Sequence, residues 1–263
     1  MLQPTSLQPT SQPTVSVVVP ARNEAATIGP IVERLVGLGP QVVEVLVVDD
    51  GSSDETAQLA ADAGARVVDA ELVLAHRRDA AGPGKGQAMW KGVAEAQGEV
   101  IVFCDADLVD FDPSYVTSLV AALVADEGAV MVKGRYPRSG TGGRVNELVA
   151  RPMLELLHPT LASLAQPLGG EYAAWRHALT VVPFVHGYGV ELGLVIDLDR
   201  HFGAGAIIET DLSERRHRNR SLDELRPQAR IVLEVALHRA GLTDAPVAQC
   251  PPLAEMTSDR RSA

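Results

Sequence analysis

Short apolar runs alternate with segments of helical periodicity through the first half of the chain, and this alternation constrains the fold more than any other feature. The β-branched run Val15–Val19 is followed by residues 24–38, where apolar side chains recur at helical spacing. Strands that alternate with helices form a mostly parallel sheet with helices on both faces. We therefore predict an α/β fold with a Rossmann-like sheet. Strands are expected over residues 15–19, 42–48, 66–68, 99–104, 129–133 and 204–210, and helices over 24–38, 54–63, 85–96, 113–125, 145–157, 187–201 and 222–239.

The two ends of the chain differ in composition from the part between them. Residues 1–14 form a degenerate Gln-Pro-Thr-Ser repeat, which cannot bury enough apolar surface to offset its ordering entropy, so a disordered tail is expected. Residues 243–263 are rich in Pro, Ser and charge and are expected to form a flexible tail. Between the tails, the regular alternation covers residues 15–136, and the less regular residues 137–242 are predicted to form a smaller lobe.

The formal net charge of −11 over 263 residues argues against binding to nucleic acid or to an anionic membrane surface. A phosphate-bearing ligand must therefore be held by a local basic cluster or by a metal ion. The chain contains no apolar run of roughly 18 residues, which a membrane-spanning helix requires, and its N-terminus lacks the pattern of a signal peptide. Two cysteines, Cys104 and Cys250, give no disulfide framework, and reduced thiols in a cytoplasmic protein are the simplest interpretation.

Three polar clusters follow strands of the predicted sheet. Residues 20–24 follow the first strand, residues 49–54 follow the second, and Asp105-Ala106-Asp107 follows the strand at 99–104. The carboxyl ends of parallel strands meet at one edge, where ligands bind in such folds. In extended chain the carboxylates of Asp105 and Asp107 face the same way, which suits a divalent cation that also takes diphosphate oxygens. Each cluster alone has an ordinary interpretation as a solvated turn or helix cap, but their conjunction favours a binding site.

Basic residues at three other places suit anion binding. Gly84-Lys85-Gly86 precedes a helix and either cradles phosphate or is only a flexible helix start. It does not match a Walker A motif, so ATP or GTP hydrolysis is unsupported. Arg144 and residues 215–220, Arg-Arg-His-Arg-Asn-Arg, are the densest cationic supply, and arginine forks match phosphate and carboxylate bidentately. The alternative for 215–220 is a solvated basic loop or a nuclear-type signal.

The clusters and Gly-Lys-Gly occur in this order in the GT-A glycosyltransferases of the inverting family 2 and their relatives, which the chain resembles. Longer motifs over residues 142–152, 166–172, 187–191 and 217–220 are similar to the glucosyl-3-phosphoglycerate synthase family. Members of that family are retaining enzymes that move glucose from UDP-glucose to the 2-hydroxyl of D-3-phosphoglycerate. The resemblance implies a GT-A fold with a nucleotide-sugar-binding half at 15–136 and an acceptor-binding half at 137–242. It also implies a Mg²⁺ or Mn²⁺ cofactor and a homodimer.

The resemblance also implies roles for individual residues. The nucleotide-sugar donor would be bound by Pro20, Ala21, Glu24, Ser52, Lys85, Asp105, Ala106, Leu168, Gly169, Gly170, Glu191 and Arg215. The phosphorylated acceptor would be bound by Gly143, Arg144, Asn146, Tyr188 and Asn219. The metal would be held by Asp107 and His217, and the catalytic residues would be Glu191, Asp107 and Lys85. By themselves His217 is more often a surface or structural residue, and Glu191 an ordinary carboxylate in the first turn of a helix.

Two features depart from the family pattern. The family usually has Thr at the position of Asn146, and residues 136–143 are shorter than expected for a loop that covers an active site.

Three other functions are less compatible with the sequence. A family 2 enzyme acting on a polyprenyl phosphate would need a membrane-facing helix or hydrophobic tail, which the polar C-terminal segment does not offer. A sugar-phosphate nucleotidyltransferase would need a Gly-rich signature that is missing. An inactive nucleotide-sugar-binding protein is disfavoured by the intact Asp105, Asp107, Lys85 and His217.

Overall fold

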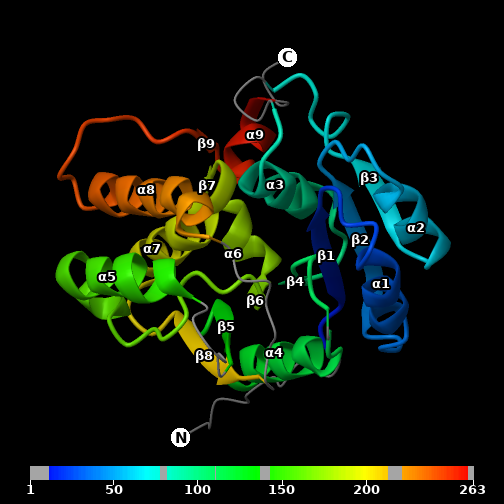
Figure 1. Cartoon of the computed structure of the whole chain (residues 1–263). Helices are drawn as coiled ribbons and strands as arrows, with labels where there is room; N and C mark the ends of the chain where they lie inside the picture. The colour runs from blue at the N-terminus through cyan, green and yellow to red at the C-terminus, as the bar shows by residue number, and fades with distance from the viewer. Residues whose placement is uncertain (1–11, 78–81, 110, 137–142, 213–220, 260–263) are drawn as a thin grey trace, which may run out of the picture.

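The computed structural model describes residues 12–77, 82–109, 111–136, 143–212 and 221–259. Its centre is a seven-stranded sheet with the order β3-β2-β1-β4-β6-β5-β8 (Figure 1). Of these strands only β6 runs opposite to the others, so the predicted mostly parallel sheet is confirmed. The strands are β1 (Val15–Ala21), β2 (Val42–Asp49), β3 (Arg66–Asp69), β4 (Val100–Phe103), β5 (Met131–Arg135), β6 (Tyr172–Trp175) and β8 (Ile207–Asp211).

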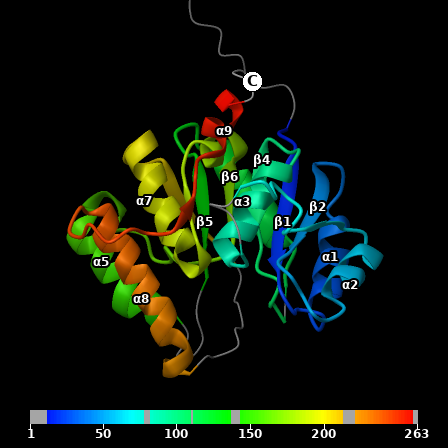
Figure 2. The same ribbon diagram turned by 90° about the horizontal axis from the view of Figure 1, so that it is seen from above.

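Helices cover both faces of the sheet, as predicted (Figures 1 and 2). One face carries α1 (Ile28–Val36), α2 (Thr56–Asp62) and α4 (Ser114–Ala125). The other carries α3 (Lys85–Glu95), α6 (Arg176–Thr180) and α7 (Val190–Phe202), with α5 (Arg151–Leu157) and α8 (Leu222–Arg239) packed beyond α7. Side chains alternate along a strand, so Val17 and Val19 join one apolar cluster while Val18 joins the other. Among the described residues, none of these helices is both long and apolar enough to cross a bilayer.

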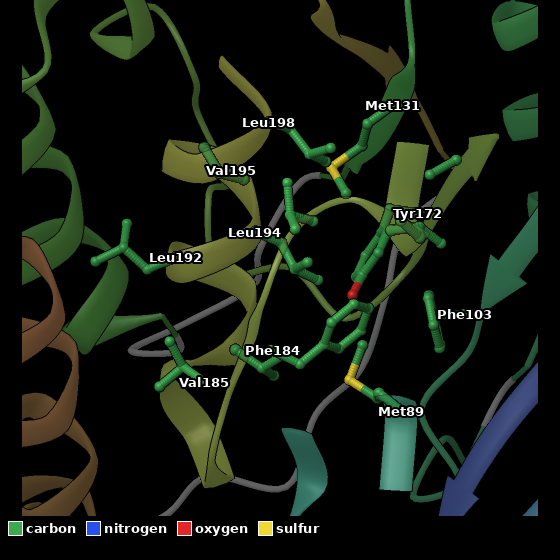
Figure 3. Packing of buried hydrophobic residues seen from close by; sticks show 14 of the residues in the cluster. Met89, Phe103, Met131, Tyr172, Phe184, Val185, Leu192, Leu194, Val195 and Leu198 are labelled. Carbon is green, nitrogen blue, oxygen red and sulfur yellow. The ribbon is translucent and has the colours of Figure 1, made fainter. Parts of the chain in front are cut away.

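The apolar cluster beneath α3 and α7 fixes these two helices relative to the sheet. Tyr172 of β6 and Phe103 of β4 belong to this cluster (Figure 3), and their ring centroids are 5.1 Å apart. Met89 of α3 and Leu194 of α7 pack around them from opposite sides, and all four are buried. Burial of apolar surface contributes about 25 cal/mol per Å². Packing against this shared cluster holds α3 and α7 in fixed positions relative to each other. Each helix carries a candidate site residue in its first turn, Lys85 in α3 and Glu191 in α7.

The C-terminal segment corrects one expectation. Instead of a flexible tail over all of 243–263, β9 (Gln249–Cys250) pairs with β7 (Phe184–Val185), and α9 (Leu253–Asp259) follows. The indole Nε1 of Trp90 in α3 donates a hydrogen bond to the carbonyl oxygen of Pro251 at 2.8 Å. These contacts join residues far apart in the sequence, so a segment without periodicity gave no sign of them. Figure 1 shows α9 against α3.

The second half of the chain contributes to the same sheet as the first. β6 was not predicted, because Tyr-Ala-Ala-Trp contains no β-branched residue, yet it lies between β4 and β5 of the first half. The helix predicted over 145–157 begins as a π-helical turn, η2 (Asn146–Ala150), and continues as α5. The 3₁₀ turns η3 (Pro159–Leu161) and η4 (Gly187–Gly189) complete the described elements. The division into donor-binding and acceptor-binding halves stays a prediction, but the halves share one sheet.

Candidate active site

A pocket of about 270 Å³ lies at the carboxyl ends of β1, β2 and β4. It brings together six of the twelve donor residues that the sequence predicted, together with Asp107 and Tyr188. Pro20 and Ala21 end β1 and Glu24 follows it. Asp105, Ala106 and Asp107 follow β4, Lys85 begins α3, and Tyr188 belongs to η4. The lining is completed by Arg22, Asp50, Gly84, Ala88 and Gly187.

The ammonium of Lys85 lies between two carboxylates. Its Nζ is 2.7 Å from Oδ1 of Asp105 and 2.6 Å from Oε1 of Glu191 in the first turn of α7. The Glu191 side chain is only 5% exposed, whereas those of Lys85 and Asp105 are 21% exposed, so the ion pairs are sheltered but border the pocket. Burial opposes the charge on Lys85, but Asp105 and Glu191 outweigh it and hold the pKa of the amine well above its ordinary value. A permanent cation is thereby fixed beside the Asp105 carboxylate.

The start of α3, and with it Lys85, is held from three sides. The amide of Gly84 donates to Oδ2 of Asp50 at 2.7 Å, and burial raises the pKa of that carboxyl group. The side-chain oxygen of Gln87 accepts from the amide of Gly187 at 3.1 Å. A Cβ on Gly86 would lie 1.9 Å from the carbonyl oxygen of Val185, so only glycine permits this approach of α3 to β7.

The two clusters after β1 and β2 are tied to each other. Asn23 adopts a left-handed conformation with φ of 56°. Its amide donates to Oγ of Ser52 at 3.0 Å, and its side-chain oxygen accepts from the amide of Ser53 at 2.8 Å. The amide of Glu24 donates to Oγ1 of Thr56 at 2.8 Å. Ser52 thus contacts Asn23 but does not line the pocket. Its role in donor binding stays a prediction.

Asp107 is exposed at the pocket, and the structure allows its fit to a divalent cation to be tested. Thr27 Oγ1 donates to the carbonyl oxygen of Ala106 at 2.6 Å, which fixes the triplet. Over the residues that the structure describes, no three His, Cys, Asp or Glu side chains gather to hold a metal. Mg²⁺ needs no such group, because it keeps several waters and is commonly bound by one or two carboxylates together with substrate phosphates. Asp107 beside a diphosphate fits that donor set.

Three residues predicted for the site, Arg215, His217 and Asn219, lie outside the described residues. β8 is parallel to β5 and ends at Asp211. Both strands run in the same direction as β4, so the chain leaves β8 at the same edge of the sheet as the pocket. Their proposed roles stay predictions.

The segment Leu168-Gly169-Gly170 reaches the site at Gly170, which packs against Asp105. A Cβ on Gly170 would lie 2.3 Å from Oδ2 of Asp105, so the backbone there packs directly on the carboxylate. Asn146, predicted to contact the acceptor, is 2% exposed. Its Nδ2 donates to the carbonyl oxygen of Ala165 at 2.9 Å, and its Oδ1 accepts from the amide of Leu168 at 3.4 Å. Gly143 and Arg144 precede η2 and do not line the pocket.

Comparison with known proteins gives the family. A family model described as glycosyl transferase family 2 matches residues 16–184. The glucosyl-3-phosphoglycerate synthase of Mycolicibacterium smegmatis is 46% identical over 244 residues, which cover 89% of this chain and 80% of that protein. The chain belongs to the glucosyl-3-phosphoglycerate synthase family. Within this family, the structure of the enzyme from Mycobacterium tuberculosis has been solved in complex with Mn²⁺, UDP-glucose and phosphoglyceric acid. That chain is 42% identical to this one, and the two structures superpose with a TM-score of 0.86. The match covers 93% of this chain and 91% of that chain. The complex of the same enzyme with Mg²⁺ and uridine diphosphate is 41% identical with a TM-score of 0.86, covering 93% and 92%.

Membership of the glucosyl-3-phosphoglycerate synthase family confirms the resemblance predicted from the motifs, and with it the GT-A fold and the glycosyltransferase class.

The sequence analysis missed several residues that shape the site in this family member. Asp50 was noticed only as part of an acidic cluster, and its role in anchoring Gly84 depends on the fold. Lys133 and Glu209 were missed altogether. A lysine directly after Met131-Val132, inside an apolar strand, was the available signal, because an unpaired lysine is almost never buried.

The Gly170→Ala variant of this glucosyl-3-phosphoglycerate synthase family member is expected to lose activity. The added methyl group must displace the Asp105 carboxylate from Lys85, and a misplacement of about 1 Å can reduce turnover on the order of 100-fold. Overpacking should also cost about 1–3 kcal/mol of unfolding free energy. Steady-state kinetics and urea unfolding measure the two effects. Gly29→Ala in α1 is the control, since its Cβ would meet nothing within 4 Å. Unchanged kcat/KM in Gly170→Ala would show that this contact does not matter.

Proposed function

We propose that the chain transfers glucose from UDP-glucose to 3-phosphoglycerate, giving glucosyl-3-phosphoglycerate, in a reaction that depends on Mg²⁺ or Mn²⁺. The observation that carries the proposal is the Lys85 ammonium fixed between Asp105 and Glu191 at the pocket where the donor motifs meet. The names of the relatives and the molecules bound in the solved structures support the same donor, acceptor and metal.

The residues of the pocket are suited to stabilise a departing diphosphate. Negative charge develops on the leaving group as the glucosyl bond breaks, and preorganised cations act most strongly on charge that develops in the transition state. Lys85 supplies such a cation, and Asp105 and Glu191 prevent it from reorienting. Asp107 would hold the divalent ion, with His217 as the proposed second ligand. When bound, this ion supplies further charge neutralisation at the diphosphate.

The proposed acceptor carries several negative charges, whereas the protein has a net charge of −11. Its binding therefore requires fixed cations. Arg144 and Asn219, with Gly143, Asn146 and Tyr188, remain the proposed acceptor residues. Tyr188 is 44% exposed and lines the described pocket, which supports its proposed contact with the acceptor.

Retention of anomeric configuration is also proposed. Glu191 is a poor nucleophile here, because its carboxylate is buried and paired with Lys85. In same-face attack the acceptor hydroxyl oxygen forms the new bond to the anomeric carbon as the bond to the phosphate oxygen breaks, and that phosphate oxygen takes the hydroxyl proton. NMR of the product should show the anomeric configuration of the donor, and the opposite anomer would contradict this route.

The proposed function is tested by incubating the protein with 3-phosphoglycerate, Mg²⁺ and one donor at a time. UDP-glucose, ADP-glucose, GDP-glucose and GDP-mannose form the panel, and mass spectrometry follows the product. Transfer of glucose from UDP-glucose in preference to the others is expected. Transfer only to a polyprenyl phosphate would support the alternative acceptor. Binding of UDP-glucose without turnover across phosphorylated acceptors would indicate an inactive nucleotide-sugar-binding protein.

Two further properties belong to the proposal. A cytoplasmic location is proposed from the cysteine content, because a chain whose two cysteines are Cys104 and Cys250 offers no disulfide framework. Formation of a homodimer is inferred from the family resemblance, and size-exclusion chromatography with light scattering tests it.

A further inference from the structure

We propose that Lys133 is a positioning residue for the donor pocket, acting with Glu209 to hold residues 165–170 against Asp105. Lys133 lies on β5 and does not line the pocket. Residues 165–170 are called the 165–170 loop below. The inference rests on the proposed function for its kinetic test, but its structural test does not require turnover.

Lys133 is completely buried, which is costly for a cation unless it is paired. Its Nζ donates to the carbonyl oxygen of Gly169 at 2.7 Å and lies 4.4 Å from the centre of the Tyr172 ring. The charged groups that face it are Glu191 of α7, Glu209 of β8, Glu171 and Lys85. Burial lowers the pKa of Lys133 to about 8, and Glu191 acts in the opposite direction, so the amine is mostly protonated at neutral pH. The protein thus places a cation under the 165–170 loop.

Side chains supply several of the hydrogen bonds that hold the 165–170 loop, in addition to its own backbone bond from the Gly169 amide to the Gln166 carbonyl at 3.0 Å. Glu209 accepts from the amides of Ala165 and Gln166 at 2.9 and 2.8 Å, at the start of the loop. Lys133 binds the Gly169 carbonyl near its end. Asn146 bonds to Ala165 and Leu168 between them. The Gln166 side chain also donates to the carbonyl oxygen of Tyr136. Because buried backbone groups must be paired, Glu209, Lys133 and Asn146 contribute directly to where the loop lies.

The 165–170 loop connects Lys133 and Glu209, together called the loop clamp, to the ion pairs of Lys85 at the pocket. Gly170, next to the residue that Lys133 holds, packs on the Asp105 carboxylate. Asp105 in turn pairs with Lys85, which pairs with Glu191. Movement of the Gly169 carbonyl therefore changes the space available to Asp105 and so the position of the Lys85 cation. Lys133 therefore influences the pocket indirectly, through Gly169 and Gly170, although it does not line the pocket.

The structural test compares hydrogen–deuterium exchange of the ligand-free wild type and Lys133→Met, which keeps the length of the side chain but removes its donor. Faster exchange is expected in peptides that cover residues 165–170 and 104–107, with no change over α1. Arg135→Met is the matched control, since Arg135 lies on the same strand but is exposed and pairs with Asp211. Exchange in Lys133→Met that matches wild type over 165–170 would overturn the proposal.

The kinetic test measures kcat and both Michaelis constants. Lys133→Met is expected to lower kcat and to raise the KM for UDP-glucose about tenfold or more, with the KM for 3-phosphoglycerate within about twofold of wild type. Equal changes in both Michaelis constants would indicate a general structural role and overturn the proposal. If Lys133→Met does not fold, Glu209→Gln carries both tests, with the same expected and contradicting results. If the wild type itself shows no turnover, the proposed function fails, while the exchange experiment still decides the role of Lys133.

Discussion

Replacing Lys85 with methionine is expected to lower kcat by about 100- to 1,000-fold, the usual cost of removing one preorganised group that stabilises transition-state charge. The loss follows from the position of the ammonium, which is 2.7 Å from Asp105 and 2.6 Å from Glu191 at the donor pocket. The variant leaves two sheltered carboxylates without their shared cation. We therefore also expect a loss on the order of 3 kcal/mol in the free energy of unfolding. Steady-state kinetics and urea unfolding provide the measurements.

A second variant separates the two effects of Lys85. Lys85→Met combined with Glu191→Gln removes the unpaired buried carboxylate and should recover much of the stability, but none of the activity. Arg230→Met is the control for loss of one positive charge, because Arg230 is exposed on α8 and pairs with Glu234. If Lys85→Met keeps wild-type kcat, the proposed stabilisation of the leaving diphosphate by this residue is wrong.

Replacing Asp107 with alanine or asparagine is expected to abolish metal-dependent turnover. Asp107 is exposed at the pocket, and hard divalent cations prefer carboxylate oxygen ligands, so either change removes a ligand with little effect on packing. We expect kcat to fall about 1,000-fold or more, on the scale of the largest losses from single charge-stabilising groups. Electron paramagnetic resonance of Mn²⁺ in the presence of UDP should show weaker metal binding.

The control for Asp107 is Asp62→Asn, which removes one negative charge from an exposed carboxylate of α2 that accepts a hydrogen bond from Gln58 at 2.8 Å. It should leave both turnover and Mn²⁺ binding unchanged. Persistence of full activity in Asp107→Asn at saturating Mg²⁺ would show that the metal, if required, is held elsewhere.

Much of the donor pocket could be predicted because one topological rule brings its parts together. Residues 20–24, 49–54 and 105–107 follow three parallel strands, so their convergence required only the order of strands and helices. The ion pair of Lys85 with Glu191 was not predictable in this way. It depends on the packing of α3 and α7 around Tyr172 and Phe103, contacts between residues far apart in the chain.

The features that the sequence missed share one physical cause. β6 has only four residues and no β-branched side chain, and β9 has two, so neither gives a local signal. The loop clamp could not be anticipated without β6, because the pairing of β6 with β5 sets Gly169 near Lys133. By contrast, α8 was predicted with its exact bounds from its amphipathic pattern, and the structure adds a capping box of Ser221 and Glu224 at its start.

The reversed direction of β6 has a consequence for how this protein is assembled. Because β6 separates β4 from β5, residues 15–136 cannot complete their own sheet, and β5 has no neighbour on that side until the chain has been synthesised past Trp175. Residues 15–136 therefore do not form an independent folding unit. The sheet can close only after β6 has been synthesised, so folding of this part of the chain must wait for residues 172–175.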